Sequence, residues 1–253
     1  IRNMGRAFEF RKERKLKRWG HMAKTFTKIG KEITIAVKQG GPDVVGNSRL
    51  RALMAEARSE NMPKDNVEKA IKRALEKNQG DFKEVVFEGY GPHGIAYLVE
   101  TATDNNTRTV ANVRSYFTKC GGSLGTSGSV SFMFDHKCVF RIKYQEGMDL
   151  DELQLALCEC DDDPEVFIEE QEDKDENITK NVVIYGAYES YGAIQKYIED
   201  NGYELVSGGF ERIPNVELKD VTPEQRETLD KLTGLLEDDD DVTNVYSTLK
   251  PAE

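Results

Sequence analysis

The sequence predicts an α+β fold of three domains, in which an N-terminal helical bundle precedes two α/β domains. Helical spacing of apolar residues runs through residues 5–80, and strands separated by turns replace it from residue 82 onward. Within residues 137–210 the predicted elements follow the order β-α-β-β-α-β, which is that of a ferredoxin-like domain. A chain of 253 residues is long enough for two or three domains with separate cores.

The bundle contains three predicted helices after a basic N-terminal segment. In residues 21–39 the apolar positions recur at spacings of three and four, which gathers them on one face, and residues 40–42, Gly-Gly-Pro, end the helix. A second helix begins near Asn47. A third begins at Pro63, because the first N–H groups of a helix have no partner within it and proline lacks only that group.

The first α/β domain begins as two strands joined by a turn. Strands are predicted at 85–88 and 94–102, and a helix follows at 106–119. The Gly/Ser-rich loop at 121–129 is interpreted as a mobile connection, with contact to RNA or phosphate as the alternative. It leads to a predicted strand at 130–134.

The ferredoxin-like domain is predicted to be inserted into the first α/β domain. Its expected elements are a strand at 138–143, a helix at 149–160, strands at 165–169 and 181–185, a helix at 189–200 and a strand at 204–207. The helix and strand that the first domain still needs come only after it, at Thr222 and at 242–246. The predicted domains are therefore 1–80, then 81–135 together with 213–253, and 136–212.

Charge is distributed very unevenly along the chain. Residues 1–80 contain 20 Lys and Arg against 9 Asp and Glu, or +11, whereas residues 81–253 contain 15 against 37, or −22. Such asymmetry is typical of a basic module that meets a polyanion and is carried by acidic modules. The acidic runs at 161–163 and 237–241 are interpreted as solvated turns.

The candidate nucleic-acid contacts are the cations of the bundle. On a helical wheel, the lysines of residues 21–39 fall within an arc of roughly 80° opposite the apolar stripe. The predicted phosphate contacts are Arg11, Arg14, Lys15, Lys17, Arg18, Lys24, Lys28, Lys31, Lys38 and Lys64. This prediction requires that the cations be exposed and not neutralised by carboxylates of the same protein.

Other classes of site have weak signals. The motif Gly89-x-Gly91-x-x-Gly94 is followed by a strand, so it predicts a hairpin turn and not a dinucleotide site. Cys120, Cys138, Cys158 and Cys160 include no C-x-x-C pair and are interpreted as reduced packing thiols. We therefore expect no catalytic residues, no metal, no cofactor and no small-molecule substrate; a hydrolase or transferase working between the α/β domains is a third alternative.

Three stretches of the sequence resemble the YebC/PmpR family. They are residues 24–33 running into 61–66, residues 106–114 leading to 128–135, and residues 236–242. That family includes bacterial proteins named as probable transcriptional regulators and a mitochondrial translational activator of a cytochrome oxidase subunit. The resemblance implies one helical and two α/β domains and no enzymatic activity.

The sequence and the resemblance together predict a non-enzymatic, nucleic-acid-binding regulator of gene expression, a DNA-binding transcriptional regulator. The alternative is a ribosome-associated translation factor that binds ribosomal RNA. No run of about eighteen apolar residues is present, so no membrane partner is expected, and a cytoplasmic location is predicted. The sequence makes no prediction of the oligomeric state.

Overall fold

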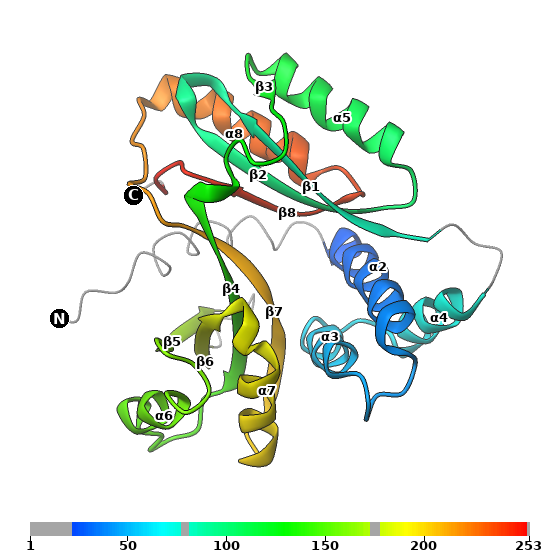
Figure 1. Ribbon diagram of the computed structural model, residues 1–253, viewed down its shortest axis with the longest axis vertical. Coiled ribbons are helices and arrows are strands. Elements are labelled where there is room, and N and C mark those ends of the chain that lie inside the picture. Colours follow the sequence, from blue (N-terminus) through cyan, green and yellow to red (C-terminus); the bar gives the residue numbers. More distant parts are fainter. Residues whose placement is uncertain (1–21, 77–80, 173–177, 252–253) are drawn as a thin grey trace. The chain divides into compact units, whose positions relative to one another are not determined.

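The computed structural model describes residues 22–76, 81–172 and 178–251 (Figure 1). The described chain divides into two compact units. The first contains residues up to 35, 76–135 and those from 212 onward, and the second contains 36–75 and 136–211. The predicted α+β class, with a helical region and two α/β parts, is confirmed, whereas the boundaries of the three predicted domains stay a prediction.

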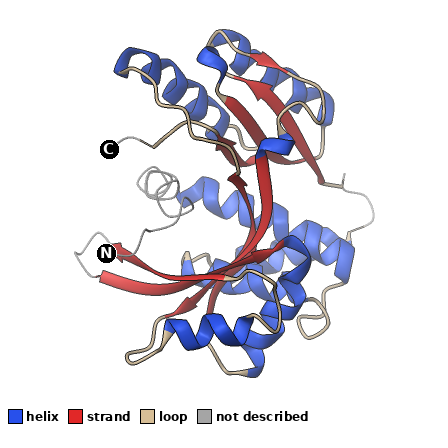
Figure 2. Cartoon of the chain, turned by 60° about the vertical axis from the view of Figure 1, so that its left-hand side comes forward, coloured by secondary structure: helices blue, strands red, loops and turns tan. Residues whose placement is uncertain are grey.

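The first unit contains a four-stranded antiparallel sheet in the order β3-β1-β2-β8. Its elements are β1 (Lys83–Tyr90), β2 (Ala96–Thr103), α5 (Asn106–Lys119), β3 (Ser123–Leu124), α8 (Pro223–Glu237) and β8 (Val242–Ser247). Both helices cover the same face of the sheet (Figures 1 and 2). Phe117 of α5 and Leu232 of α8 are fully buried there against Tyr97 of β2. The β1–β2 connection is a hairpin, as predicted from the glycine motif.

The other face of this sheet holds a buried carboxylate. Glu88 is 5% exposed and accepts hydrogen bonds from the backbone N–H groups of Gly128 (2.7 Å), Val130 (2.8 Å) and Ser131 (2.8 Å). Gly128 has a φ of +86°, which favours glycine. The loop at 121–129 was predicted to be mobile; it is instead bonded to Glu88 at Gly128 within the loop and at Val130 and Ser131 immediately after it. These three N–H groups are therefore not available to a phosphate.

The second unit contains a four-stranded sheet in the order β5-β6-β4-β7. Its elements are β4 (Phe134–Lys143), α6 (Leu150–Leu157), β5 (Glu165–Glu172), β6 (Ile178–Ala187), α7 (Tyr191–Asp200) and β7 (Leu205–Pro214). Phe140 and Ile184 of the sheet pack with Leu157 and Ile194 of the helices. The β-α-β-β-α-β order and this arrangement of strands confirm the ferredoxin-like prediction.

Three helices come from the N-terminal region: α2 (Met22–Gly40), α3 (Ser48–Ser59) and α4 (Lys64–Leu75). They begin and end near the predicted points. Asn47 caps α3 by accepting a hydrogen bond from the Leu50 N–H at 3.0 Å. In the second unit, Arg51 of α3 makes an ion pair with Glu199 of α7 at 2.8 Å, and Ala52 packs in the core with Phe140.

Two other local predictions were wrong. Residues 130–134 do not form a separate strand: residues 131–133 make a 3-10 turn, and β4 runs unbroken from Phe134 to Lys143. The acidic run at 161–163 is not wholly solvated, because Asp161 is 7% exposed and accepts from the N–H of Ala187 at 2.7 Å. Burial alone would raise the pKa of Asp161, but hydrogen bonds from Ser190, Ala187 and Asp163 lower it below its ordinary value.

Candidate nucleic-acid interface

The five predicted phosphate contacts that the structure describes are divided between the two units. Arg11, Arg14, Lys15, Lys17 and Arg18 lie outside the described residues. Lys24, Lys28 and Lys31 belong to the first unit, and Lys38 and Lys64 to the second. Lys38 and Lys64 are exposed, and Lys28 is half-buried.

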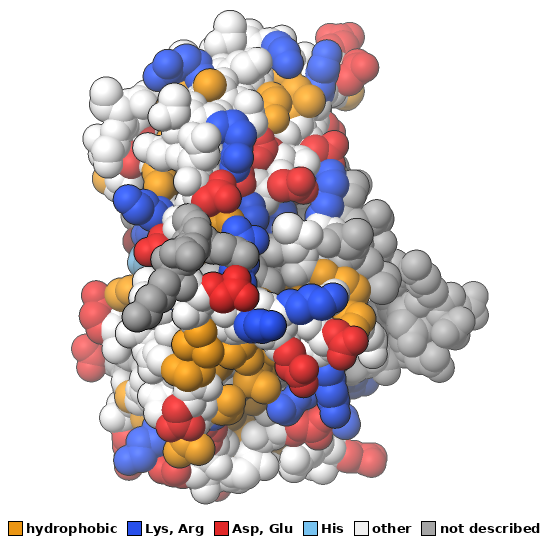
Figure 3. All heavy atoms as spheres, turned by 90° about the vertical axis from the view of Figure 1, so that its right-hand side faces the viewer, with side chains coloured by type: hydrophobic (Ala, Val, Ile, Leu, Met, Phe, Trp, Pro, Cys, Tyr) orange, Lys and Arg blue, Asp and Glu red, His pale blue; other side chains and the backbone are white. Residues whose placement is uncertain are grey.

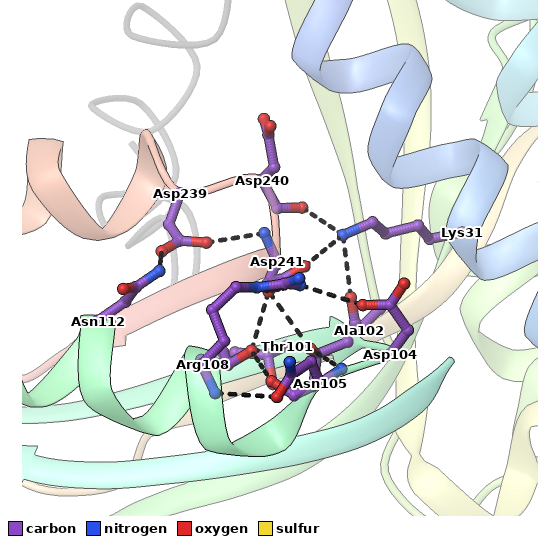
Figure 4. Close-up of polar contacts among 12 residues, drawn as sticks. Lys31, Thr101, Ala102, Asp104, Asn105, Arg108, Asn112, Asp239, Asp240 and Asp241 are labelled. Atoms are coloured by element: carbon purple, nitrogen blue, oxygen red, sulfur yellow. Dashed lines mark hydrogen bonds and ion pairs between the residues drawn. The ribbon is translucent and has the colours of Figure 1, made fainter. Parts of the chain in front are cut away.

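Lys31 was predicted to face solvent, and this prediction was wrong. The residue is only 9% exposed, and its Nζ donates to the Ala102 carbonyl (3.1 Å), the Asp240 carbonyl (2.7 Å) and Asp241 Oδ1 (2.8 Å), as Figure 4 shows. An ammonium group has three N–H donors, so all three are used. Lys31 therefore has no donor left for a phosphate.

The helical wheel failed at Lys31 because the middle of α2 is buried on more than one side. Ile29 and Ile33 lie on the predicted apolar stripe, and both are buried. Lys31 and Thr34, which lie off that stripe, are also buried, at 9% and 2% exposure. The amphipathic pattern identifies the apolar face correctly, but it cannot reveal a second contact that is polar.

Lys24 makes a weaker contact of the same kind. Its Nζ lies 2.7 Å from Asp238 Oδ1, and the two side chains are 32% and 57% exposed. Exposed ion pairs contribute about 0–1 kcal/mol to stability. A phosphate can therefore displace Asp238 from Lys24 at little cost.

Asp241 is the centre of a buried polar network in the first unit. One carboxylate oxygen, Oδ1, accepts from Lys31. The other, Oδ2, accepts from Arg108 Nη2 at 2.6 Å and from Thr109 Oγ1 at 2.9 Å. Thr103 Oγ1 lies 3.3 Å from the same oxygen. Asp241 is 4% exposed, so the acidic run at 237–241 is not the wholly solvated turn that was predicted, although Asp238 and Asp240 are exposed.

Asp239 extends this network along α5. Its Oδ2 accepts from Asn112 Nδ2 at 3.1 Å, and its Oδ1 accepts from the Asp241 N–H at 2.9 Å (Figure 4). The same Oδ2 also accepts from the Tyr116 hydroxyl at 2.9 Å. Burial and then the bond to Asp239 raise the pKa of Tyr116 to about 12. The turn before β8 is thus joined by polar bonds to α2 and to successive turns of α5.

The electrostatics of Asp241 predict an acid-sensitive fold. Burial alone would raise the pKa of this carboxyl, but hydrogen bonds from Lys31, Arg108 and Thr109 lower it from 3.8 to about 2. Because the folded protein favours the charged carboxylate, the ionised Asp241 stabilises the folded state. This stabilisation is present above the ordinary pKa of 3.8 and is lost as pH falls toward 2. It is worth about 2 kcal/mol at neutral pH.

We therefore expect the free energy of unfolding of the first unit to fall between pH 5 and pH 2, and to fall by about 2 kcal/mol more in the unchanged protein than in Asp241→Asn. Denaturant unfolding at several pH values measures this difference. Asp240→Asn is the matched control, because Asp240 is exposed and its side chain is not bonded to Lys31. Equal acid sensitivity of the unchanged protein and Asp241→Asn would contradict the assignment.

The sequence did contain a signal for this network. The three stretches that resemble a known family supply Lys24 and Lys31, then Arg108 and Asn112, and finally Asp239 and Asp241. The structure brings these stretches into one set of contacts. The residues of these three stretches bond to one another in the polar contacts between α2, α5 and the turn before β8.

The face of the molecule shown in Figure 3 has mixed charge. On the face shown in Figure 3, Lys and Arg side chains are interspersed with Asp and Glu side chains and do not form one large cationic area. No group of His, Cys, Asp and Glu within the described ranges is arranged to hold a metal ion. Of the helices that the structure describes, none is long and apolar enough to cross a bilayer.

The cysteines are free thiols. Cys120 and Cys138 are buried in the two cores, as expected for packing thiols, whereas Cys158 is exposed. Burial raises the pKa of Cys138 to about 12, so this thiol stays protonated and unreactive near neutral pH.

Comparison with known proteins shows relatives over the whole chain. A probable transcriptional regulatory protein of Parabacteroides distasonis is 60% identical over 247 residues, which cover 98% of this chain and 97% of that protein. One of Bacteroides thetaiotaomicron is 58% identical over 250 residues, covering 99% and 98%. The crystal structure of a conserved hypothetical protein from Aquifex aeolicus has a TM-score of 0.72 and 32% identity over 91% of each chain.

Two family models match consecutive parts of the chain. Residues 6–77 match the TACO1/YebC protein N-terminal domain, and residues 82–249 match the TACO1/YebC second and third domain. The order of these matches is the order of the helical region and the two sheets. With full-length relatives at this level of identity, the chain belongs to the TACO1/YebC family.

Proposed function

We propose that this protein is a non-enzymatic regulator of gene expression that acts in the cytoplasm by binding promoter DNA. The observation that carries the proposal is the charge of +11 on residues 1–80, against −22 on the rest of the chain. The names of the relatives, probable transcriptional regulatory proteins, support a regulatory role. In this proposal residues 1–80 form the binding domain, and the domains at 81–135 with 213–253 and at 136–212 hold the acidic charge.

The proposed interface consists of the predicted cations without Lys31. Residues 1–21 alone contain eight Lys and Arg against two Glu, so more than half of the excess positive charge precedes α2. Lys38 and Lys64 are exposed, and Lys24 contacts Asp238 through an exposed ion pair and a hydrogen bond to its carbonyl at 3.2 Å. Long-range repulsion from the acidic domains is weakened because charges are screened beyond about 8 Å at physiological salt.

The alternative partner is ribosomal RNA, with the protein acting as a translation factor. Phosphate contacts position a protein on a nucleic acid but do not read its sequence. The same cations therefore suit either polymer, and selectivity has to be measured directly.

Selection from a pool of random 40-base-pair duplexes, alongside sedimentation with ribosomes at matched salt, tests the proposal. We expect a preferred subset of duplexes to be enriched. If about six cations meet phosphates, the slope of log affinity against log salt is on the order of −5. Replacing Arg14, Lys15, Lys17 and Arg18 with Gln should reduce the size of this slope by about 3 to 4.

The control variant is Lys143→Gln with Lys180→Gln, which removes two exposed cations paired with Glu204 and Glu170. It should leave both the affinity and the slope nearly unchanged. Firm association with ribosomes, together with DNA binding that has no sequence preference and vanishes at moderate salt, would favour the translation factor and overturn the DNA proposal.

A further inference from the structure

The outer face of α5 is cationic and contains no acid. At 100° per residue, seven side chains of this face occupy an arc of about 140°. They are the exposed Thr107, Arg108, Ala111, Arg114, Thr118 and Lys119 and the half-buried Ser115. Asn106, the first residue of the helix, is also exposed but lies outside this arc. The opposite side, with Val113 and Phe117, is fully buried. The face therefore offers three cations and three hydroxyl groups around one small residue.

This composition is unusual for its surroundings. Residues 76–135 and 212–253 together contain 10 Lys and Arg against 18 Asp and Glu, yet α5 has three of the cations and none of the acids. The neighbouring helix α8 shows the ordinary mixture, since it exposes Glu224, Glu227 and Lys231. A face that serves only to meet water normally mixes both signs, as α8 does.

The helix is also held firmly in place. Thr109 and Arg108 bond to Asp241, and Asn112 and Tyr116 bond to Asp239. These bonds lie at the side and the N-terminal end of α5 and leave Arg114 and Lys119 outside the network. The cations of the outer face are thus presented on a rigid support, which lowers the entropy lost on binding.

We propose that the outer face of α5 is a second nucleic-acid contact, which binds the phosphate backbone of double-stranded DNA through Arg114 and Lys119. This inference rests on the proposed function and extends it to a unit whose net charge is negative. Thr107 and Ser115 supply hydroxyl donors, whereas the Thr118 hydroxyl already donates to the Arg114 carbonyl at 2.9 Å. Ala111 permits close approach of the backbone. Arg108 contributes less, because Asp241 and Asp104 already accept from its guanidinium.

The test compares DNA affinity and its salt dependence for the full chain and two double variants. Arg114→Gln with Lys119→Gln removes the proposed contacts, and Lys143→Gln with Lys180→Gln removes the same charge elsewhere. Losing two phosphate contacts should weaken binding about tenfold or more near 0.1 M salt and reduce the size of the slope by about 2. The control variant should keep the slope of the unchanged protein.

The outcomes separate this inference from the function on which it rests. If the unchanged protein binds duplex DNA and the α5 variant matches the control, the α5 contact is wrong and the proposed function stands. If the unchanged protein binds ribosomal RNA and not duplex DNA, both proposals are overturned. Circular dichroism of the α5 variant excludes loss of fold as the cause of weak binding, since both side chains point to solvent.

Discussion

Asp241→Asn is expected to lower the free energy of unfolding of the first unit by about 3–5 kcal/mol, because it leaves a buried cation without its counter-charge. The side chains of Lys31 and Asp241 are 11% and 6% exposed. The asparagine amide still accepts a hydrogen bond, but it carries no charge to balance Lys31 and Arg108. Chemical denaturation, followed by far-ultraviolet circular dichroism, measures this loss of unfolding free energy.

A double-mutant cycle shows whether the ion pair itself is responsible. Lys31→Met alone leaves Asp241 with Arg108, and Lys31→Met with Asp241→Asn removes both buried charges. We expect the double variant to be more stable than the sum of the two single losses predicts, because contacting residues are energetically coupled. Asp240→Asn is the control for the loss of one negative charge. Additive losses, or an equal loss in Asp240→Asn, would contradict a central role for Asp241.

The elements of the fold could be predicted largely from local signals. Asn47 and Pro63 mark the starts of α3 and α4, and Thr222 begins α8 through a capping box with Gln225. These signals act within a few residues, so one sequence is enough to read them. The β-α-β-β-α-β order follows from the same kind of evidence.

The buried charges could not be predicted in this way. Lys31 and Asp241 are 210 residues apart, and the helical and turn patterns around them do not indicate that they pair. A lysine on the polar side of an amphipathic helix normally faces water, so the local pattern of α2 favoured exposure. A run of four aspartates likewise favours a solvated turn, although two of the four are buried because α2 and α5 supply their donors.

The loop at 121–129 illustrates the same limit. Glycine and serine in such numbers favour mobility when the loop is considered alone. Glu88 lies on a strand about forty residues earlier, and its carboxylate accepts from the N–H of Gly128 in the loop and from those of Val130 and Ser131 just after it. A single buried carboxylate thus converts a flexible composition into a fixed connection.

Glu88→Ala is therefore expected to release this loop and to lower the free energy of unfolding of the first unit by about 3 kcal/mol or more. Three N–H groups lose their acceptor, and each buried, unsatisfied donor costs about 1–3 kcal/mol unless water reaches it. Glu88→Gln should cost less, about 1–2 kcal/mol, since its amide oxygen still accepts. Hydrogen exchange at residues 128, 130 and 131 reports the release directly.

The acceptor role has a further consequence for acid conditions. Burial alone would raise the pKa of Glu88, yet the bonds from Gly128, Val130 and Ser131 lower it below its ordinary value of 4.5. The stabilisation by ionised Glu88 is thus present above that value and is lost at lower pH. We therefore expect the amides of residues 128, 130 and 131 to lose more hydrogen-exchange protection in acid than the amides of β2, when each rate is compared with its intrinsic rate. Glu84→Gln, at an exposed position of the same strand, should leave this exchange unchanged. Undiminished protection in Glu88→Ala would mean that the loop is held by other contacts.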